Sequence, residues 1–561
     1  MKVRHHTLGI LCAALFAACA QPAVPTLSVI AATPTHPPPA ALPVPALRDT
    51  WYLDADGDGY GSPDDSVWRE EQPLGWVALG TDCDDANPTI HPAAYDRCGD
   101  ALDEDCDGVA ASCQELWAAD ADLTLNGLEG DVYAGYRLGA AGDVNADGYD
   151  DAFVSSFEAW GFSTTMGRVY LLHGSADGLA PDGLGLAGAI EIEGTIPTQR
   201  LGMYPGAAGD MNADGYPDLA LGCPDLDFPE DQNGTVYLMA GPLTADTTPE
   251  DAFAVLTSTT PDDHAGDGLA AAGDVDGDGY DDLLVAAFDA QGREGLAYLV
   301  PGPISGALSL QSSGFTIANH EARDRPITSA AALGDSDGDG LADLAFGSRR
   351  ESSEHDEAGA IFIFRGPLYG DQSISDADVV ILGEYEDQLL GIAMEGVGDA
   401  NGDGLGDLLV ATRGEYGPLA PEVGGGTWLL LGPFDADSEL ADAQAHFVND
   451  DEIWTGEDLG AAGDVDGDGR ADFLIATDGY GGGPDDPLAR LVTGGTQGTY
   501  LLSEIGVAFH DGTTQSLDGT VAGVGDVDGD GFSDLMVGSW TNRDSGASAG
   551  AAWLFYGHGG F

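Results

Sequence analysis

Aspartates at every second position of one short segment are the residues of this chain whose types and spacing could do chemistry. Residues 271–287 read AAGDVDGDGYDDLLVAA, in which Asp274, Asp276, Asp278 and Asp282 fall within nine positions and no basic residue stands among them. Carboxylates this close repel one another unless a cation lies between them. Ca²⁺, which takes six to eight oxygen ligands, would remove that repulsion.

The same segment occurs seven times. The copies begin at residues 142, 209, 273, 334, 398, 463 and 525 and are 61 to 67 residues apart. Counted from the first aspartate, positions 1, 3, 5 and 9 carry side-chain oxygens, and position 7 can offer its main-chain carbonyl. Alternation brings the first three side chains to one point, so we predict all five as ligands. The predicted ligands are Asp143, Asn145, Asp147, Tyr149, Asp151, Asp210, Asn212, Asp214, Tyr216, Asp218, Asp274, Asp276, Asp278, Tyr280, Asp282, Asp335, Asp337, Asp339, Leu341, Asp343, Asp399, Asn401, Asp403, Leu405, Asp407, Asp464, Asp466, Asp468, Arg470, Asp472, Asp526, Asp528, Asp530, Phe532 and Asp534.

The loop differs from an EF-hand. Gly279, at position 6, permits a sharp turn, but position 12, where an EF-hand carries a bidentate Glu, is Val285 inside an apolar run. The alternative is a plain hairpin turn, because Asp-Gly and Asn-Gly pairs favour turns without a metal. That alternative leaves three further oxygens at fixed offsets in all seven copies unexplained. We therefore expect about seven Ca²⁺ ions with a structural role.

The charge of the chain agrees with cations as ligands. Its 561 residues include 97 acidic and 18 basic side chains, a formal net charge of −79. Nucleic acid and anionic lipid would be repelled by such a surface, so neither is expected as a direct partner. The hydrophobic fraction of 43% is still large enough to form cores.

Short apolar runs surround every acidic loop. DLLVAA (282–287) follows one loop directly, and GLAYLVPG (295–302) follows some residues later. Runs of four to seven residues, rich in β-branched and aromatic side chains and bounded by Gly, Pro and Asp, are typical of strands. A period near 64 residues with about four strands predicts an all-β fold, a seven-bladed β-propeller. The last unit lacks a fourth strand, and we predict that residues 122–126 supply it and close the ring.

The first 49 residues indicate export. Residues 1–20 have a basic start and a short apolar run, which is typical of an export signal rather than a membrane span. Two endings stay open: A-x-A cleavage, which releases the protein, or a lipobox-like LFAAC that places a lipid on Cys19. That lipid would be the protein's only link to a membrane. Residues 21–49, rich in Pro and Ala, form a linker. We expect a bacterial protein that is secreted or held at the cell surface or outer membrane.

Residues 50–113 form a separate acidic module with four cysteines. An even number of cysteines in an exported segment predicts two disulfides with three connectivities open. Zinc is the alternative, but it is disfavoured because no C-x₂-C pair occurs. The cysteines are Cys83, Cys98, Cys106 and Cys113.

The seven loops resemble the FG-GAP repeat, the unit of the β-propeller of integrin α-subunits and of many exported bacterial proteins. The resemblance covers about residues 118–561, and we place the propeller at 114–561. The family's glycine eight residues before the first aspartate is present in five copies. These glycines are Gly135, Gly202, Gly266, Gly391 and Gly456.

Residues 50–113 resemble an acidic, cysteine-containing metal-binding module of large exported bacterial proteins. The matching stretches are YLDADGDGYG, TDCDDANPTIHPAA and DEDCDG. The resemblance implies one or two further Ca²⁺ ions. The candidate ligands are Asp54, Asp56, Asp58 and the Tyr60 carbonyl in one site, and Asp103, Asp105 and Asp107 in the other.

The motifs give little support for catalysis. GDSDG (334–338) matches the G-x-S-x-G nucleophile elbow, but Ser336 occupies the variable second position of an acidic loop, without the required strand–turn–helix. We expect a monomeric, non-enzymatic protein that serves adhesion by binding an extracellular protein or glycan. The alternative is a polysaccharide-acting enzyme or its binding subunit with a site in the propeller channel, for which Trp160, Trp454 and Trp540 are candidate contacts.

Overall fold

The computed structural model describes the chain from residue 49 to its end, with gaps. The residues left out after residue 49 are 57–58, 64, 70, 88–89, 93–105, 107–114, 129–132, 157–165, 180–184, 197–199, 225–232, 262, 289–294, 319–326, 353–354, 414–424, 436–437, 449–453, 479–486, 512–518, 543–548 and 560. The export signal and linker predicted for residues 1–20 and 21–49 therefore lie outside the described residues, apart from Asp49.

Strands dominate the described residues and form seven sheets of four or five strands, called blades 1 to 7 in chain order. Blades 1 to 4 contain β6 (Ala134–Gly142), β7 (Asp151–Ser156), β8 (Arg168–Leu172) and β9 (Ile190–Glu193); β10 (Tyr204–Gly209), β11 (Asp218–Cys223), β12 (Thr235–Met239), β13 (Ala254–Thr257) and β17 (Gly306–Ser309); β14 (Gly268–Gly273), β15 (Asp282–Ala287), β16 (Leu296–Val300), β18 (Phe315–Ala318) and β22 (Gln372–Ser373); and β19 (Ser329–Gly334), β20 (Asp343–Ser348), β21 (Ala360–Phe364) and β23 (Val379–Leu382).

The remaining sheets complete the set. Blades 5 to 7 contain β24 (Met394–Gly398), β25 (Asp407–Thr412), β26 (Gly426–Leu430), β27 (Ala445–Val448) and β31 (Gly498–Leu501); β28 (Trp454–Gly463), β29 (Asp472–Asp478), β30 (Ala489–Val492), β32 (Val507–His510) and β4 (Glu115–Trp117); and β33 (Gly519–Gly525), β34 (Asp534–Ser539), β35 (Ala551–Phe555) and β5 (Leu123–Asn126). The described helical segments are single turns: α2 (Leu310–Ser313), η1 (Gly185–Gly188), η2 (Pro249–Asp251), η3 (Ile374–Asp376), η4 (Leu440–Asp442) and η5 (Leu502–Glu504).

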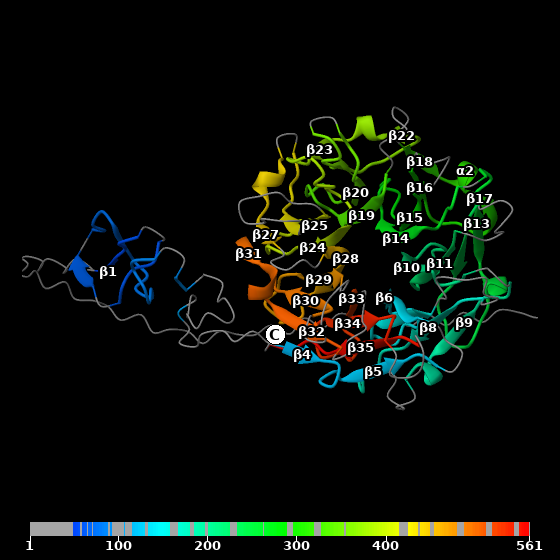
Figure 1. Cartoon of the computed structure of the whole chain (residues 1–561), viewed down its shortest axis with the longest axis horizontal. Helices are drawn as coiled ribbons and strands as arrows, with labels where there is room; N and C mark the ends of the chain where they lie inside the picture. The colour runs from blue at the N-terminus through cyan, green and yellow to red at the C-terminus, as the bar shows by residue number, and fades with distance from the viewer. Residues whose placement is uncertain are drawn as a thin grey trace, which may run out of the picture.

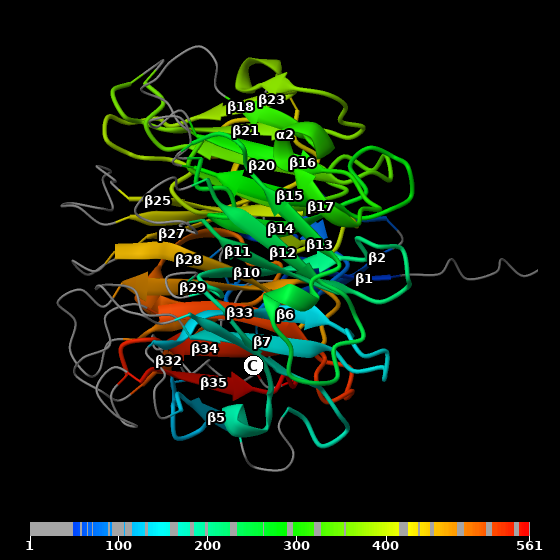
Figure 2. The same ribbon diagram turned by 90° about the vertical axis from the view of Figure 1, so that its right-hand side faces the viewer.

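The blades stand around a common axis (Figure 1). The first strand of each blade is innermost and contacts the first strand of the next blade, and β33 of blade 7 contacts β6 of blade 1. Seen from the side, neighbouring sheets stack against one another around the ring (Figure 2). The predicted all-β propeller class is therefore confirmed.

The ring closes with a strand from its own beginning. β5 pairs antiparallel with β35, with Leu125 opposite Ala552 and Leu123 opposite Leu554. The prediction that residues 122–126 supply the missing strand of the last blade is thus confirmed. The short strand β4 just before it pairs in parallel with β32 of blade 6, which was not predicted. The segment before blade 1 therefore pairs with the outer edges of both blade 6 and blade 7.

The outer edges of other blades are also covered by chain from the next repeat. β17 pairs in parallel with β13, β22 with β18, and β31 with β27. In each case the segment between the third and fourth strands of one blade crosses to the edge of the preceding blade. Such pairing satisfies main-chain groups that an exposed sheet edge would leave open.

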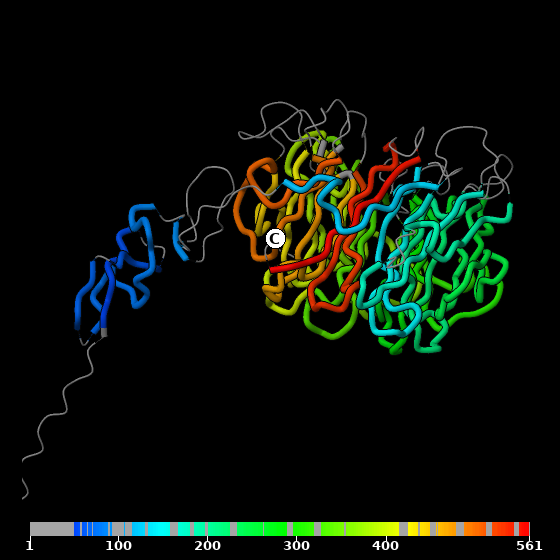
Figure 3. The backbone as a smooth tube through the Cα atoms, turned by 90° about the horizontal axis from the view of Figure 1, so that it is seen from below, coloured from blue at the N-terminus to red at the C-terminus, as the bar shows by residue number. Residues whose placement is uncertain are grey.

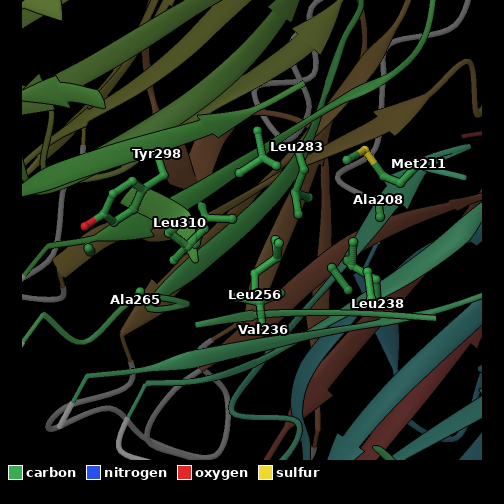
Figure 4. Close-up of a cluster of buried hydrophobic side chains, with 14 of the residues drawn as sticks. Ala208, Met211, Val236, Leu238, Leu256, Ala265, Leu283, Tyr298 and Leu310 are labelled. Atoms are coloured by element: carbon green, nitrogen blue, oxygen red, sulfur yellow. The ribbon is translucent and has the colours of Figure 1, made fainter. Parts of the chain in front are cut away.

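The cores lie between blades. In the cluster between blades 2 and 3, Val236 and Leu238 of one sheet pack against Leu283 and Tyr298 of the next (Figure 4). Met211, which is completely buried there, is the second residue of an acidic loop. Strands buried on both faces explain the nearly continuous apolar runs of the sequence.

The N-terminal module has its own three-stranded sheet of β1 (Asp49–Leu53), β2 (Ser66–Arg69) and β3 (Trp76–Val77). It lies apart from the ring (Figure 3). One disulfide joins Cys83 to Cys106, whereas Cys98 and Cys113 lie outside the described residues. Among the helices that the structure describes, none is long and apolar enough to span a membrane.

Candidate metal-binding loops

Each acidic loop connects the innermost strand of a blade to its second strand. In blade 3, β14 ends at Gly273, a β-bulge residue with φ of 71°, and β15 begins at Asp282, the ninth loop residue. Gly279, at position 6, has φ of 90°, in the left-handed region that glycine tolerates best. The predicted sharp turn at position 6 is therefore present.

The first aspartate organises the turn. In blade 3 the Asp274 Oδ1 atom accepts hydrogen bonds from the main-chain N–H groups of Gly277 (2.7 Å) and Asp278 (3.1 Å). Its Oδ2 atom accepts one from Gly279 at 2.9 Å. The same bonds from positions 5 and 6 recur in other loops, for example at Asp526. These hydrogen bonds fold the loop into a cup around the carboxylate of its first residue.

The ninth residue ties the loop to the rest of its blade. Asp282 is completely buried; its Oδ2 accepts from the Val275 N–H and its Oδ1 from the Gly302 N–H, each at 3.0 Å. Gly302 is the second residue after the third strand, β16. In all seven blades the carboxylate at position 9 accepts a hydrogen bond from the equivalent glycine.

Burial raises the pKa of the carboxyl groups at position 9, because no positive group among the described residues offsets their loss of solvent. It raises the pKa of Asp282 and Asp472 to about 7; the main-chain hydrogen bonds oppose this shift, and neighbouring loop carboxylates add to it. The pKa of Asp151, Asp218, Asp407 and Asp534 is raised to about 7 in the same way. The pKa of Asp343 is also raised, mainly by burial. A cation in the cup would restore the ionised form.

Four of the seven loops bring three carboxylates to one point. In each set, one oxygen from every residue lies within 4.8 Å of the others. The sets are Asp274, Asp276 and Asp282; Asp335, Asp337 and Asp339; Asp464, Asp466 and Asp472; and Asp526, Asp528 and Asp534. The other three loops carry Asn at position 3. In blade 2 the Asn212 side-chain NH₂ group donates a hydrogen bond to the Asp218 carboxylate at 3.1 Å.

Position 4 also separates the loops. Gly277 and its equivalents in blades 4 to 7 have φ between 76° and 84°. Blades 1 and 2 place Ala146 and Ala213 there, with φ of 57° and 60°. Because a side chain disfavours this left-handed conformation, the first two loops are the more strained.

Neighbouring loops are hydrogen-bonded to one another. At five junctions the N–H of position 8 donates to the carbonyl oxygen of position 1 in the preceding blade, and between blades 2 and 3 the Asp210 N–H donates to the Asp281 carboxylate instead. Examples are Ala342 to Asp274 at 3.0 Å and Gly406 to Asp335 at 2.9 Å. Blade 2 has Pro217 at position 8, which carries no N–H, so its junction with blade 1 cannot form this bond. The loops are thus a connected belt with a weaker junction between blades 1 and 2.

The side chain at position 7 covers the preceding loop. A β-carbon on Gly277 would lie 3.4 Å from Leu341, and one on Gly402 would lie 3.7 Å from Arg470. This contact explains the large and chemically varied side chains at position 7, where only the carbonyl is a predicted ligand.

The N-terminal module gathers a related cluster. Asp54 and Asp56 each place an oxygen within 4.8 Å of one from Asp85. Asp85 also accepts a hydrogen bond from the Ala55 N–H at 2.8 Å. Asp85 was not predicted as a ligand, although it belongs to the TDCDDANP stretch. Tyr60 stacks on His91 with ring centroids 5.2 Å apart. Of the other predicted ligands in this module, Asp58, Asp103, Asp105 and Asp107 lie outside the described residues.

The structure also describes several of the other residues named as candidates in the sequence. Ser336 is 1% exposed and donates to the Asp343 carboxylate at 2.5 Å, which leaves it inaccessible as a nucleophile. Trp540 packs edge-to-face on Tyr133, with centroids 5.0 Å apart. Trp160 and the side chain of Trp454 lie outside the described residues. The unpaired Cys223 is completely buried at the end of β11.

Two family models match the chain. The family described as "FG-GAP repeat" matches residues 206–239, which contain the loop of blade 2. The family described as "Putative metal-binding motif" matches residues 82–111, which contain the Cys83–Cys106 disulfide.

The similar proteins include phospholipases D and integrin alpha chains. Phosphatidylinositol-glycan-specific phospholipase D of Rattus norvegicus is 35% identical over 164 residues, covering 27% of this chain and 18% of the relative. Integrin alpha-8 of Mus musculus is 32% identical over 163 residues, covering 28% and 14%. Integrin alpha-PS3 of Drosophila melanogaster is 26% identical over 272 residues, covering 44% and 22%. The matches thus span less than a quarter of each relative. The chain carries an FG-GAP repeat within a β-propeller and a metal-binding-motif segment in its N-terminal module.

Proposed function

We propose that this protein is an exported calcium-binding β-propeller that serves adhesion, with calcium holding the blades in place. The observation that carries the proposal is the ring of acidic loops, four of which bring three carboxylates within 4.8 Å of one another. Without a cation, the acid groups of each loop would repel one another. The metal site is structural, since position 9 of each loop also binds the main chain after the third strand.

Calcium suits these loops better than other common ions. The donors are carboxylate, amide and carbonyl oxygens, which hard cations prefer, and no loop contains Cys or His among its ligand positions. Mg²⁺ demands near-ideal octahedral geometry, whereas Ca²⁺ accepts the irregular cup of a short turn. In the N-terminal module, Asp54, Asp56 and Asp85 would hold a further ion.

The acidic loops, with their large side chains at position 7, lie on one face of the ring. Other strand connections lie on the opposite face, so the ring offers two broad faces for contact with a partner. Integrin alpha chains are among its relatives, and the strongly acidic surface would favour a partner with basic patches. We infer an extracellular protein or glycan as the ligand. Export follows from the signal-like residues 1–20, with Cys19 as the candidate site of a lipid anchor.

Binding and its dependence on calcium can be tested together. The mature chain, immobilised in about 1 mM Ca²⁺, would be exposed to a glycan array and to a panel of extracellular matrix proteins, and then washed with EDTA. Calcium-dependent retention of a ligand without chemical change supports the proposal. Retention that survives full removal of calcium would contradict a role for the ion in keeping the binding surface intact.

A polysaccharide-acting role is the second candidate. It is supported by a carboxyl pair outside the acidic loops, Glu395 and Asp458, which faces the channel. Enzymes also occur among the relatives, as the phospholipase D names show. Release of reducing ends from a polysaccharide, lost in Glu395→Gln, would favour this candidate over simple binding.

A further inference from the structure

The seven innermost strands enclose a cavity of about 590 Å³. Residues of all seven line it, and most of them are small, such as Gly139, Ala140, Gly460 and Ala461. Small side chains allow the inner strands to converge while leaving the axis open. The cavity is therefore a channel along the axis of the ring.

Charged side chains gather at one end of this channel. Arg137 and Asp458 lie in the first halves of β6 and β28, Glu395 is the second residue of β24, and Asp267 immediately precedes β14. All four line the cavity. Because the inner strands run toward the acidic loops, these charges lie at the opposite end of the channel from the calcium loops.

One guanidinium is held in place there. The Arg137 Nη1 atom lies 3.8 Å from the Asp458 Oδ1 atom, and the guanidinium sits over the rings of Tyr136 (5.3 Å) and Tyr204 (5.7 Å). The Asp458 Oδ2 atom accepts a hydrogen bond from the Val521 N–H at 3.1 Å. Arg137 and Asp458 therefore orient each other.

Glu395 differs, because nothing among the described residues donates a hydrogen bond to its side chain or forms an ion pair with it. The like-charged Asp458 acts on it electrostatically. Burial, and then that neighbour, raise the pKa of Glu395 to about 8. A positive group bound beside Glu395 would relieve both effects.

The charge balance favours a cation as ligand. Glu395, Asp458 and Asp267 line this end of the cavity together with Arg137 among the described residues, and the whole chain carries a formal charge of −79, so the field draws cations in and keeps anions out. Ca²⁺ fits poorly, because it needs six to eight oxygen ligands and this end of the channel offers fewer carboxyl groups than that. The described clusters of three close carboxylates lie in the loops and the N-terminal module, not here. An ammonium has three N–H donors to share between two carboxyls and can also rest on an aromatic ring.

We propose that this end of the channel binds a small organic cation through a primary ammonium group, which sits between Glu395 and Asp458. Polyamines and amino sugars share this chemistry and are small enough for the cavity. The proposal is independent of the surface binding described above, because it concerns the interior of the ring.

The test is calorimetric titration of the calcium-saturated full chain. Spermidine and glucosamine are the probes, and the neutral N-acetylglucosamine and the acidic glucuronate are controls. We expect at least one ammonium probe to bind, neither control to bind, and Glu395→Gln to weaken binding at least tenfold. Glu250→Gln, on the exposed η2 turn, removes the same charge outside the channel and should leave the affinity unchanged. Preference for spermidine or glucosamine identifies the source.

Several outcomes would overturn the proposal. The proposal is wrong if the wild-type chain binds neither spermidine nor glucosamine. It is also wrong if the wild-type chain and Glu395→Gln bind the probe with equal affinity. Glucuronate binding more tightly than glucosamine would show that Arg137, not Glu395, selects the ligand. If Glu395→Gln does not fold, Asp458→Asn provides the second variant. In either variant, the rise in melting temperature that the probe causes in wild type should be absent.

Discussion

The main-chain N–H of Asp150 donates a hydrogen bond to the carbonyl oxygen of Asp526 at 3.2 Å, and the N–H of Asp526 donates to the Asp150 carboxylate at 2.9 Å. These two residues lie 376 positions apart, in the loops of the first and last blades. The belt of acidic loops therefore crosses the junction at which the ring closes. Among the residues described, blade 3 shares the second of these bonds, with the Asp281 carboxylate accepting from the N–H of Asp210.

Removing the Asp150 side chain should weaken the closing junction. Asp150→Ala loses the acceptor for the Asp526 N–H, and we expect a loss of about 1 kcal/mol in the free energy of unfolding. Asp150→Asn keeps an acceptor oxygen and should lose less. Asp177→Ala, an exposed residue of blade 1, removes the same charge away from the junction. Chemical denaturation measures all three; equal stability of the Asp150 and Asp177 variants would show that this contact contributes nothing.

Closure by β5 gives a second prediction. Leu125 is completely buried against Ala552 and Leu554, so Leu125→Ala should cost about 2–5 kcal/mol. Thr124→Ala, at the exposed neighbouring position, should cost little. Hydrogen exchange should show faster exchange in β35, more than 400 residues away in sequence, only in the Leu125 variant. Unchanged protection of β35 would contradict the pairing.

The acidic loops contain two kinds of aspartate that can be told apart. Asp282→Asn places an amide against one of the two main-chain donors of a buried site, so it should cost about 1–3 kcal/mol even without calcium. Asp276→Asn, at a partly exposed position, should change the calcium-free stability by less than about 0.5 kcal/mol. Both should weaken calcium binding. Thermal unfolding in EDTA, together with calcium titration, measures both effects; equal calcium-free stability of the two variants would contradict the structural role of position 9.

Without calcium, stability should fall as the pH rises from 5 to 8. The pKa of Asp282 is about 7 in the folded chain against 3.8 as its ordinary value. A carboxyl with a raised pKa holds its proton more tightly when folded. Its contribution to stability is thus complete below about pH 4 and is lost as the pH rises through 7.

Calcium should reverse this dependence, because it binds the ionised carboxylates and competes with protons. Melting temperatures at pH 5 and pH 8, in EDTA and in excess Ca²⁺, give the comparison. In EDTA the higher value belongs to pH 5, and in Ca²⁺ to pH 8. A calcium-free protein that is more stable at pH 8 would show that the buried carboxyls do not titrate as described.

Sequence reasoning reached the repeats, the fold class and the strand that closes the ring, because each depends on a local pattern that recurs or is visibly missing. The bond from Gly302 to Asp282 was out of reach, since it joins residues 20 positions apart through a strand register that no local pattern encodes. The proximity of Asp85 to Asp54 could not be predicted for the same reason, because only the folding of the module brings the two residues together. β4 has only three residues, too few for a strand pattern.

Differences among the loops were visible but not interpretable in the sequence. Pro217 stands at position 8 of its loop, yet its meaning depends on the hydrogen bond that other blades make from this position to the preceding loop. Ala146 likewise acquires significance only once its φ of 57° is known. The charges of the channel come from different blades and meet only when the ring closes.

The most direct test of the central claim, that calcium holds the ring of loops together, is to measure bound calcium and thermal unfolding on the same purified chain. At about 1 mM free Ca²⁺ and a dissociation constant near 10⁻⁴ M, each site contributes about 1.4 kcal/mol. Seven such sites would correspond to a shift of about 10 °C in a domain of this size. We predict seven or more bound ions and a fall of this order in EDTA. No bound calcium and an unchanged melting temperature would contradict the account, and would leave the aspartates as turn residues only.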